Sequence, residues 1–213
     1  MLSDTTGTWT PVALSADLPP ATVIPAWTPA GPIALWRSQS RRLSASSDRC
    51  PHRGMRLSHG FVRGDALSCI YHGWSYSPTG RCIRIPAHPD LVPPETIRVA
   101  VQQVEEQGGI IWVAVGEPAV GPPPLDHLVP LRSLTLEADI AAIEAAAGGQ
   151  VGADGLIRIV DYPWIRLLPA AQTDRTLVHV LVEQGRSVAD RLVASRIAET
   201  VRRGAETGRK DAA

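Results

Sequence analysis

Two short segments of the sequence each place one cysteine close to one histidine. The first is Cys50-Pro51-His52-Arg53-Gly54, and the second is Cys69-Ile70-Tyr71-His72-Gly73-Trp74. Two thiolates suit an iron that stays oxidised, whereas two neutral imidazoles let a second iron accept an electron at a higher potential than thiolates would. We therefore predict one [2Fe–2S] cluster per chain, with bridging sulfides completing both iron sites. Its metal ligands are Cys50, His52, Cys69 and His72.

Several neighbouring residues are expected to surround this cluster. Pro51 stiffens the first segment between its two ligands because its ring fixes φ. Gly54 and Gly73 follow the ligands, where we expect backbone N–H groups to approach the sulfides closely. Trp74 is a candidate cover over the cluster.

Other uses of these residues fit the sequence less well. Two cysteines and two histidines can hold structural zinc, but the Cys-x-His spacing is tighter than in usual zinc knuckles. A Cys/His nucleophile pair would need an orienting third residue, and the sequence suggests none. The third cysteine, Cys82, is interpreted as a free, half-buried thiol, and His59 and His88 as loop or surface histidines.

The sequence around the ligands resembles the Rieske domain of Rieske non-heme iron oxygenases. The resemblance covers a little over half of the chain and implies the same four ligands. Within that family the sequence is most similar to monooxygenases and demethylases of small aromatic compounds. Besides the ligand segments, the resemblance to this family rests on three further segments: Trp9-Thr10-Pro11-Val12-Ala13-Leu14, Arg81-Cys82-Ile83-Arg84-Ile85-Pro86 and Ile111-Trp112-Val113.

Three positions differ from the Rieske proteins of cytochrome bc complexes. Those proteins carry an extra cysteine in each ligand loop, joined as a disulfide, where this sequence has Met55 and Tyr71. They also carry a serine that donates a hydrogen bond to a sulfide, where this sequence has Trp74. Loss of that donor lowers the reduction potential, although Tyr76 can donate to a cysteine sulfur instead. The sequence therefore predicts a low-potential cluster of the oxygenase type.

An oxygenase of this family also binds a mononuclear iron through two histidines and a carboxylate. After residue 124 the sequence has only His127 and His179, and we interpret both as structural histidines. The stretch after Asp126 is also short for the family's catalytic domain. We therefore expect an electron-transfer protein that passes single electrons from a reductase to a separate oxygenase component. The alternatives are a compact or split oxygenase or demethylase acting on a small aromatic compound, and a non-catalytic sensor or assembly module.

The overall composition is that of a globular protein without a charge bias. The 213 residues are 44% hydrophobic, and 21 Lys and Arg balance 21 Asp and Glu. This balance gives no long-range attraction to nucleic acid or to membranes. With no apolar run near the roughly 18–20 residues of a membrane span and no secretion signal, we expect cytoplasmic localisation. Arginines near the first ligand segment could form a docking face for an acidic partner, but we interpret them as solvated surface: Arg41, Arg42, Arg49, Arg53 and Arg56.

The distribution of prolines divides the chain, because 17 of the 19 lie at or before Pro130. We expect a mainly β protein: a Rieske-type antiparallel β-sandwich with cluster-binding loops over residues 1–124, and a small α+β domain over residues 125–213. Gly121-Pro122-Pro123-Pro124 is the expected connector. Runs of apolar or alternating residues predict strands at 33–36, 66–71, 97–101, 109–115, 156–160 and 176–182.

Two helices are expected in the second part. The first covers 138–147 and stops at Gly148-Gly149. The second begins at a capping box of Ser187 and Asp190 and runs to Gly204, with residues 206–213 frayed. Its buried face is predicted to consist of Val188, Leu192, Ile197 and Val201.

Overall fold

The structure is a computed structural model that describes residues 7–210. The chain forms two compact units, one built mainly from residues 15–105 and the other mainly from residue 122 onward. Two short segments, 11–14 and 106–111, group with the second unit. The domain boundary between residues 124 and 125 remains a prediction.

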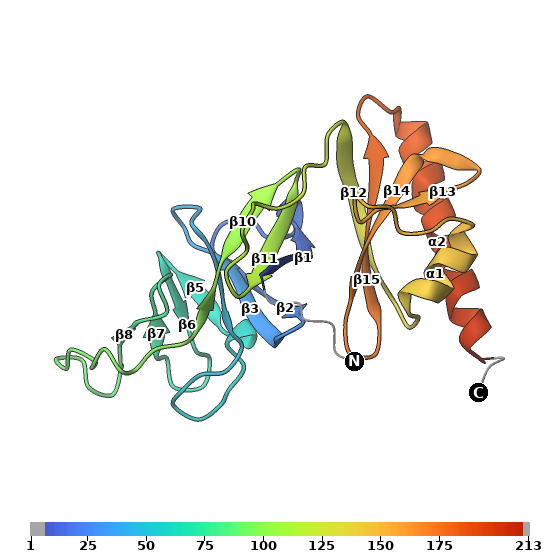
Figure 1. The fold of residues 1–213 in the computed structure, drawn as a ribbon. Coiled ribbons are helices and arrows are strands. Elements are labelled where there is room, and N and C mark those ends of the chain that lie inside the picture. The colour runs from blue at the N-terminus through green and yellow to red at the C-terminus, as the bar shows by residue number, and fades with distance from the viewer. Residues whose placement is uncertain (1–6, 211–213) are drawn as a thin grey trace. The chain divides into compact units, whose positions relative to one another are not determined.

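The first part of the chain consists of short strands in three sheets (Figure 1). The strands are β1 Thr8–Leu14, β2 Thr22–Thr28, β3 Gly31–Arg37, β4 Leu43–Ser47, β5 Phe61–Arg63, β6 Ala66–Ser68, β7 Ser75–Tyr76, β8 Cys82–Arg84, β9 Val101–Gln102, β10 Val104–Gln107 and β11 Ile110–Val115. Two sheets have the orders β2-β3-β4-β9 and β5-β6-β7-β8, with antiparallel pairing throughout. The third has the order β1-β11-β10. The fold is therefore mainly β, as predicted.

Two of the predicted strands are shorter than expected by more than one residue at an end. The strand predicted over 66–71 ends at Ser68, because the chain turns at Cys69 to form a closed loop. In the stretch 97–101 only Val101 belongs to a strand. Val99 points into the core and is 4% exposed, and its N–H donates to the Gly80 carbonyl at 2.8 Å. The alternation of apolar residues there reflects one buried side of a loop, not a strand.

The core of the first unit surrounds the cysteines. All three are free thiols, and Cys82 is fully buried at 0% exposure, not half-buried as predicted. Trp36, Leu67 and Tyr76 pack in the same cluster, each 1% exposed. Burial of each large side chain contributes about 1.5–3 kcal/mol to the stability of the folded unit. This rigid core therefore lies directly behind the ligand segments.

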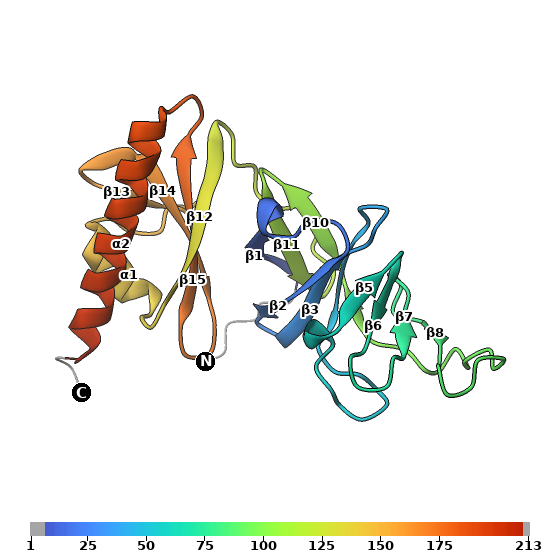
Figure 2. The same cartoon turned by 180° about the vertical axis from the view of Figure 1, so that it is seen from behind.

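The second unit is one antiparallel sheet with two helices, seen from both sides in Figures 1 and 2. Its strands are β12 Leu128–Leu136, β13 Ile157–Ile159, β14 Tyr162–Ala171 and β15 Thr176–Glu183, and its helices are α1 Ile140–Ala147 and α2 Val188–Lys210. The strand order is β12-β15-β14-β13, and both helices pack on one face of the sheet. Neither helix, within the residues described, is both long and apolar enough to cross a membrane.

The starts of both helices follow ordinary capping chemistry. The carboxylate of Asp139 accepts a hydrogen bond from the Ala142 N–H at 2.8 Å, and Gly148 ends α1 with a φ of 69°. The predicted capping box is confirmed, because the Ser187 hydroxyl accepts from the Asp190 N–H and the Asp190 carboxylate accepts from the Ser187 N–H.

The end and the buried face of α2 differ from the prediction. The helix continues through Gly204 to Lys210, and a Cβ placed on Gly204 would lie 3.3 Å from the Ala146 Cβ. Val188 and Leu192, predicted to be buried, are 75% and 56% exposed. Val201 is buried as predicted, and Ile197 packs partly buried against the same core. The other buried positions are small residues: Ala194, Ala198 and Ala205. Alanines let the two helices approach closely. A prediction that looks only for large apolar side chains does not identify these alanines as buried.

We expect Ala198→Leu to destabilise the second unit by about 1–3 kcal/mol, because Ala198 is 2% exposed and a larger side chain must displace its neighbours. Urea denaturation followed by helical circular dichroism measures this loss. The matched control is Ala189→Leu on the exposed side of the same helix, which we expect to change the free energy of unfolding by less than about 0.5 kcal/mol. Equal effects of the two substitutions would contradict this assignment of the buried face.

Candidate metal centre

The first ligand loop follows β4 and closes on itself. The Cys50 N–H donates to the Met55 carbonyl at 2.8 Å, and the Gly54 N–H donates to the Cys50 carbonyl at 2.8 Å. Gly54 has a φ of 70°, a conformation that favours glycine. The buried Asp48 fixes the base of the loop, because its carboxylate accepts from the N–H and the hydroxyl of Ser58 at 2.7 and 2.8 Å.

The second ligand loop repeats this pattern after β6. The Cys69 N–H donates to the Trp74 carbonyl and the Gly73 N–H to the Cys69 carbonyl, both at 2.9 Å. Gly73 also has a φ of 70°, and a Cβ there would lie 2.9 Å from the Cγ of Pro86. The Ser75 hydroxyl donates to the Gly73 carbonyl at 3.1 Å and so fastens the end of the loop.

The structure gives the two glycines a role in closing the loops. The N–H groups of Gly54 and Gly73 both donate to the carbonyl of the cysteine four residues earlier. The expected approach of backbone N–H groups to the bridging sulfides in this region stays a prediction.

The two loops bring two thiols and two imidazoles together. The rings of His52 and His72 lie edge to face with their centroids 4.7 Å apart, and Cys50 and Cys69 belong to the same buried cluster. Cys50 and Cys69 are 3% and 2% exposed, whereas His52 is half-buried and His72 is exposed. The sulfur donors therefore face the core and the nitrogen donors face solvent.

This donor set fits a [2Fe–2S] cluster. Among residues 7–210, no three Cys, His, Asp or Glu side chains converge as they would around a single metal ion. Two buried thiols and two outer imidazoles are a donor set that suits two irons linked by sulfide. The residues that could hold the cluster are Cys50, Cys69, His52 and His72, the four predicted from the sequence.

The protonation of the donors is set by burial and by the loop backbone. Burial raises the pKa of the Cys69 thiol, while the N–H groups of Tyr71 and His72 lower it by donating to the sulfur. Partial burial, followed by the neighbouring His72 and Arg53, lowers the pKa of His52. The lowered pKa favours the neutral imidazole, which is the form that binds a metal ion.

Tyr76 reaches the candidate site from inside the core. Its hydroxyl lies 3.1 Å from the Cys50 sulfur, as the sequence suggested. Burial, together with the neighbouring cysteines, raises the pKa of Tyr76, so the phenol stays protonated and donates to the sulfur when Cys50 is a thiolate.

Aromatic rings support both histidines from the outside. The Trp74 ring is stacked on His52 with a centroid distance of 4.4 Å and an interplanar angle of 3°. The Tyr71 ring lies against His72 at 3.9 Å. Trp74, predicted as a cover over the cluster, is thus placed to orient one imidazole. Pro51 is exposed between the two donors of the first loop.

One residue of the site was not identified from the sequence. Asp48 is 1% exposed, and it holds the first ligand loop through Ser58. The sequence feature that could have identified it is the position of this acidic residue, two residues before the first cysteine ligand. A buried carboxylate is costly unless it is fully hydrogen-bonded, which explains why it accepts both a backbone and a hydroxyl donor.

The other four histidines are not among the predicted ligands. His179 is fully buried in β15, its Nδ1 lies 2.8 Å from the Ser133 hydroxyl, and burial lowers its pKa to about 4. His127 has a φ of 61°, and its carbonyl accepts from the Gln184 N–H at 2.7 Å. His59 and His88 are surface histidines, as predicted: His59 is exposed at the end of the short 3-10 helix Leu57–His59, and His88 is exposed in a loop.

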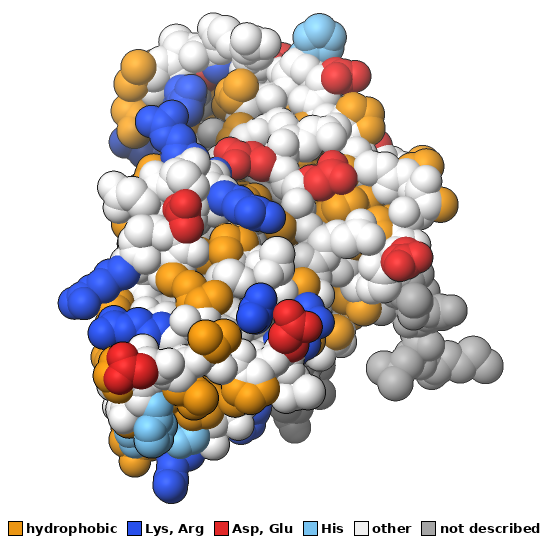
Figure 3. Space-filling view, turned by 90° about the vertical axis from the view of Figure 1, so that its left-hand side faces the viewer, with side chains coloured by type: hydrophobic (Ala, Val, Ile, Leu, Met, Phe, Trp, Pro, Cys, Tyr) orange, Lys and Arg blue, Asp and Glu red, His pale blue; other side chains and the backbone are white. Residues whose placement is uncertain are grey.

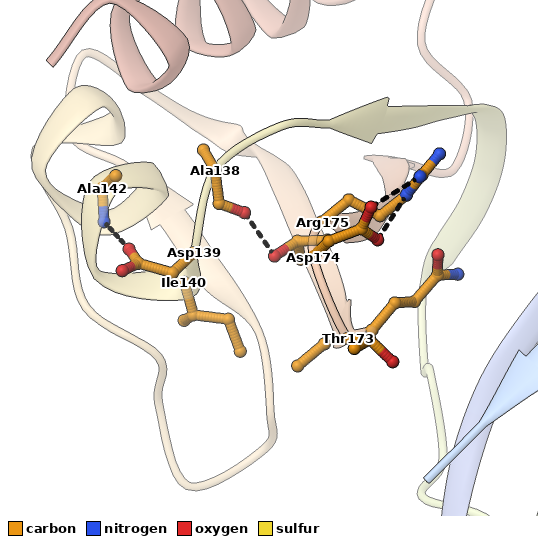
Figure 4. A pocket seen from close by; sticks show the side chains of 10 residues that line it. Ala138, Asp139, Ile140, Ala142, Thr173, Asp174 and Arg175 are labelled. Carbon is orange, nitrogen blue, oxygen red and sulfur yellow. Dashed lines mark hydrogen bonds and ion pairs between the residues drawn. The ribbon is translucent and has the colours of Figure 1, made fainter. Parts of the chain in front are cut away.

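A concavity of about 440 Å³ in the second unit offers no comparable chemistry (Figure 4). Its lining includes no cysteine or histidine. The Thr176 hydroxyl donates to the Ala138 carbonyl at 2.7 Å, the Asp139 carboxylate caps α1, and Arg175 pairs with Asp174 at 2.8 Å. These polar groups hold the helix start and the β14–β15 turn in place.

Comparison with known proteins relates the ligand loops to one family. Residues 8–104 match the family described as the Rieske [2Fe-2S] domain. The oxidoreductase NdmD of Pseudomonas putida is 44% identical over 111 residues, which are 52% of this chain and 19% of NdmD. The 4beta-methylsterol monooxygenase of Methylococcus capsulatus is 45% identical over 92 residues, which are 41% of this chain and 24% of that protein. The match thus covers less than a quarter of each relative.

A solved structure extends the likeness in fold to both units. NdmB of Pseudomonas putida CBB5 matches with a TM-score of 0.70 over 93% of this chain and 81% of NdmB. The sequence identity is 17%, so this comparison concerns the fold alone.

We expect Tyr76→Phe to lower the midpoint potential of the cluster, because the hydrogen bond to the Cys50 sulfur favours the reduced, more negative state. A tenfold change in this preference corresponds to about 59 mV for a one-electron couple, and we expect a shift of that order. Redox titration followed by EPR measures it. Tyr71→Phe is the control, because it keeps the ring contact with His72 and leaves the potential unchanged. An unchanged potential in Tyr76→Phe would show that the hydroxyl does not tune the cluster.

Proposed function

We propose, from the premise that residues 8–104 form a Rieske [2Fe–2S] domain with relatives among Rieske oxygenases and demethylases, that this chain transfers single electrons within an oxygenase system. The domain binds a [2Fe–2S] cluster, which accepts and releases one electron. In this proposal a reductase is the electron donor and a separate oxygenase component is the acceptor.

The observation that carries the proposal is the orientation of the four donors. Cys50 and Cys69 are the proposed ligands on the core side, and His52 and His72 are the proposed ligands on the solvent side. The exposed imidazoles bring the site to the surface, where a partner protein can approach it. The core side is closed by packed residues such as Trp36 and Leu67. Electrons would therefore enter and leave through the histidine edge.

The second candidate function is a compact or split oxygenase or demethylase acting on a small aromatic compound. The 45% identity to the 4beta-methylsterol monooxygenase of Methylococcus capsulatus over 92 residues favours an oxygenase. It requires a mononuclear iron bound by two histidines and a carboxylate. His179 is buried and lies against Ser133, whereas His127 lies in the turn before β12. The two histidines therefore do not form an evident pair of iron ligands. This arrangement favours the electron-transfer protein.

We expect two irons and two acid-labile sulfides per chain after anaerobic purification, because the four donors suit one [2Fe–2S] cluster. Metal and sulfide analysis measures this ratio. Cys50→Ala should abolish cluster binding, whereas Cys82→Ala, the same change at a buried thiol outside the donor set, should keep both irons. Three irons with two sulfides would favour the oxygenase, and zinc without sulfide would overturn the cluster.

We expect the chemically reduced chain to pass one electron to a Rieske-type oxygenase component and to convert no aromatic substrate by itself. Stopped-flow absorbance under anaerobic conditions follows reoxidation of the chain. Incubation with a reductase, oxygen and a methoxybenzoate, with formaldehyde as the readout, tests for its own turnover. Formaldehyde production by the chain and reductase alone would establish the second candidate instead.

A further inference from the structure

We propose that the surface around His52 and His72 is a docking face for a small electron-transfer protein with a carboxylate-rich surface. The proposal rests on the electron-transfer function and names the chemistry of the partner. It reverses our interpretation of the arginines near the first ligand segment as solvated surface.

The first observation is a strong local imbalance of charge in a neutral chain. Residues 37–100, which include both ligand loops, contain ten arginines, no lysine and four acidic residues, a net charge of +6. One of the four acids, Asp48, is buried and bound to Ser58, so it does not offset charge at the surface. The cluster-binding region therefore presents positive charge although the whole chain is balanced.

The second observation is where these arginines lie. Arg53 directly follows His52 in the first ligand loop, Arg56 comes directly after the loop, and both are exposed. Arg49 is exposed, and its guanidinium lies 3.5 Å from the Cβ position of Gly54. In Figure 3, histidine side chains lie beside hydrophobic, basic and acidic side chains near the lower edge of the view.

The third observation is that these arginines are not engaged in ion pairs. Within residues 7–210, no carboxylate lies at ion-pair distance from Arg49, Arg53 or Arg56. Arg81, by contrast, pairs with Glu95 at 3.5 Å. Unpaired guanidinium groups are available to bind the carboxylates of a partner, often through two hydrogen bonds at once.

Exposed apolar side chains adjoin the charged groups. Ile70 and Tyr71 in the second ligand loop are 56% and 60% exposed, and the Tyr71 ring contacts His72. An apolar centre with a polar rim is the usual composition of a protein–protein interface. This surface thus combines exposed apolar side chains, the imidazoles of the proposed cluster ligands and surrounding arginines. A redox protein with carboxylates around its own exposed cofactor complements all three.

The proposal is tested by measuring the affinity of the cluster-loaded chain for an acidic flavodoxin at low ionic strength. The test variant is R53Q/R56Q. The matched control is R41Q/R42Q, which removes the same charge at the exposed turn before β4, at the far end of that strand from the ligand loop. We expect R53Q/R56Q to weaken binding by about tenfold and R41Q/R42Q by less than about threefold. Raising the ionic strength from about 0.01 M to about 1 M should abolish the difference, because it shortens the Debye length from about 30 Å to about 3 Å.

Three results would overturn the docking face: equal losses in both variants, binding of the basic mitochondrial cytochrome c as tight as that of flavodoxin, or tighter binding of a single-stranded oligonucleotide. Iron content and reduction by dithionite are measured on every variant. An unmodified chain that holds no iron or is not reduced by dithionite would count against the electron-transfer function itself. Normal iron content and normal reduction, together with equal losses of binding in R53Q/R56Q and R41Q/R42Q, would count against the docking face alone.

Discussion

Every property of the candidate centre depends on the way the two ligand loops close. In each loop the backbone N–H and carbonyl of the cysteine are both hydrogen-bonded within the loop, at 2.8 Å around Cys50 and 2.9 Å around Cys69. These bonds fix the cysteine with its thiol in the core. The histidine, two or three positions further along, then lies on the outer side of the same turn. Burial of the sulfurs and exposure of the imidazoles thus follow from one repeated turn.

This separation of the donors assigns different tasks to the two sides of the site. On the inner side the surroundings are apolar, which strengthens the hydrogen bond between Tyr76 and the Cys50 sulfur. On the outer side the rings of Trp74 and Tyr71 orient His52 and His72 without enclosing them. The core can therefore tune the electronic properties of the centre, while the surface controls which partner approaches it.

The sequence was most informative where the interaction is local. The ligand loops, the glycine stop of α1 at Gly148 and the Ser187 capping box each lie within a few residues, and the structure has them as expected. Features that depend on distant contacts were missed or misread. The apolar alternation at 97–101 comes from packing of a loop, and the buried alanines of α2 depend on the approach of α1, which no local pattern reveals.

The distribution of charge explains why a neutral chain can still select its partner. Because the whole chain has no net charge, its attraction to a distant protein is weak beyond the Debye length, about 8–10 Å at physiological ionic strength. Within that distance the unpaired Arg49, Arg53 and Arg56 dominate the local field. They therefore affect the orientation of a partner more than its capture. For an electron carrier orientation is the stricter requirement, since the exposed His72 lies in the second ligand loop and a partner bound far from that loop gains no access to the site.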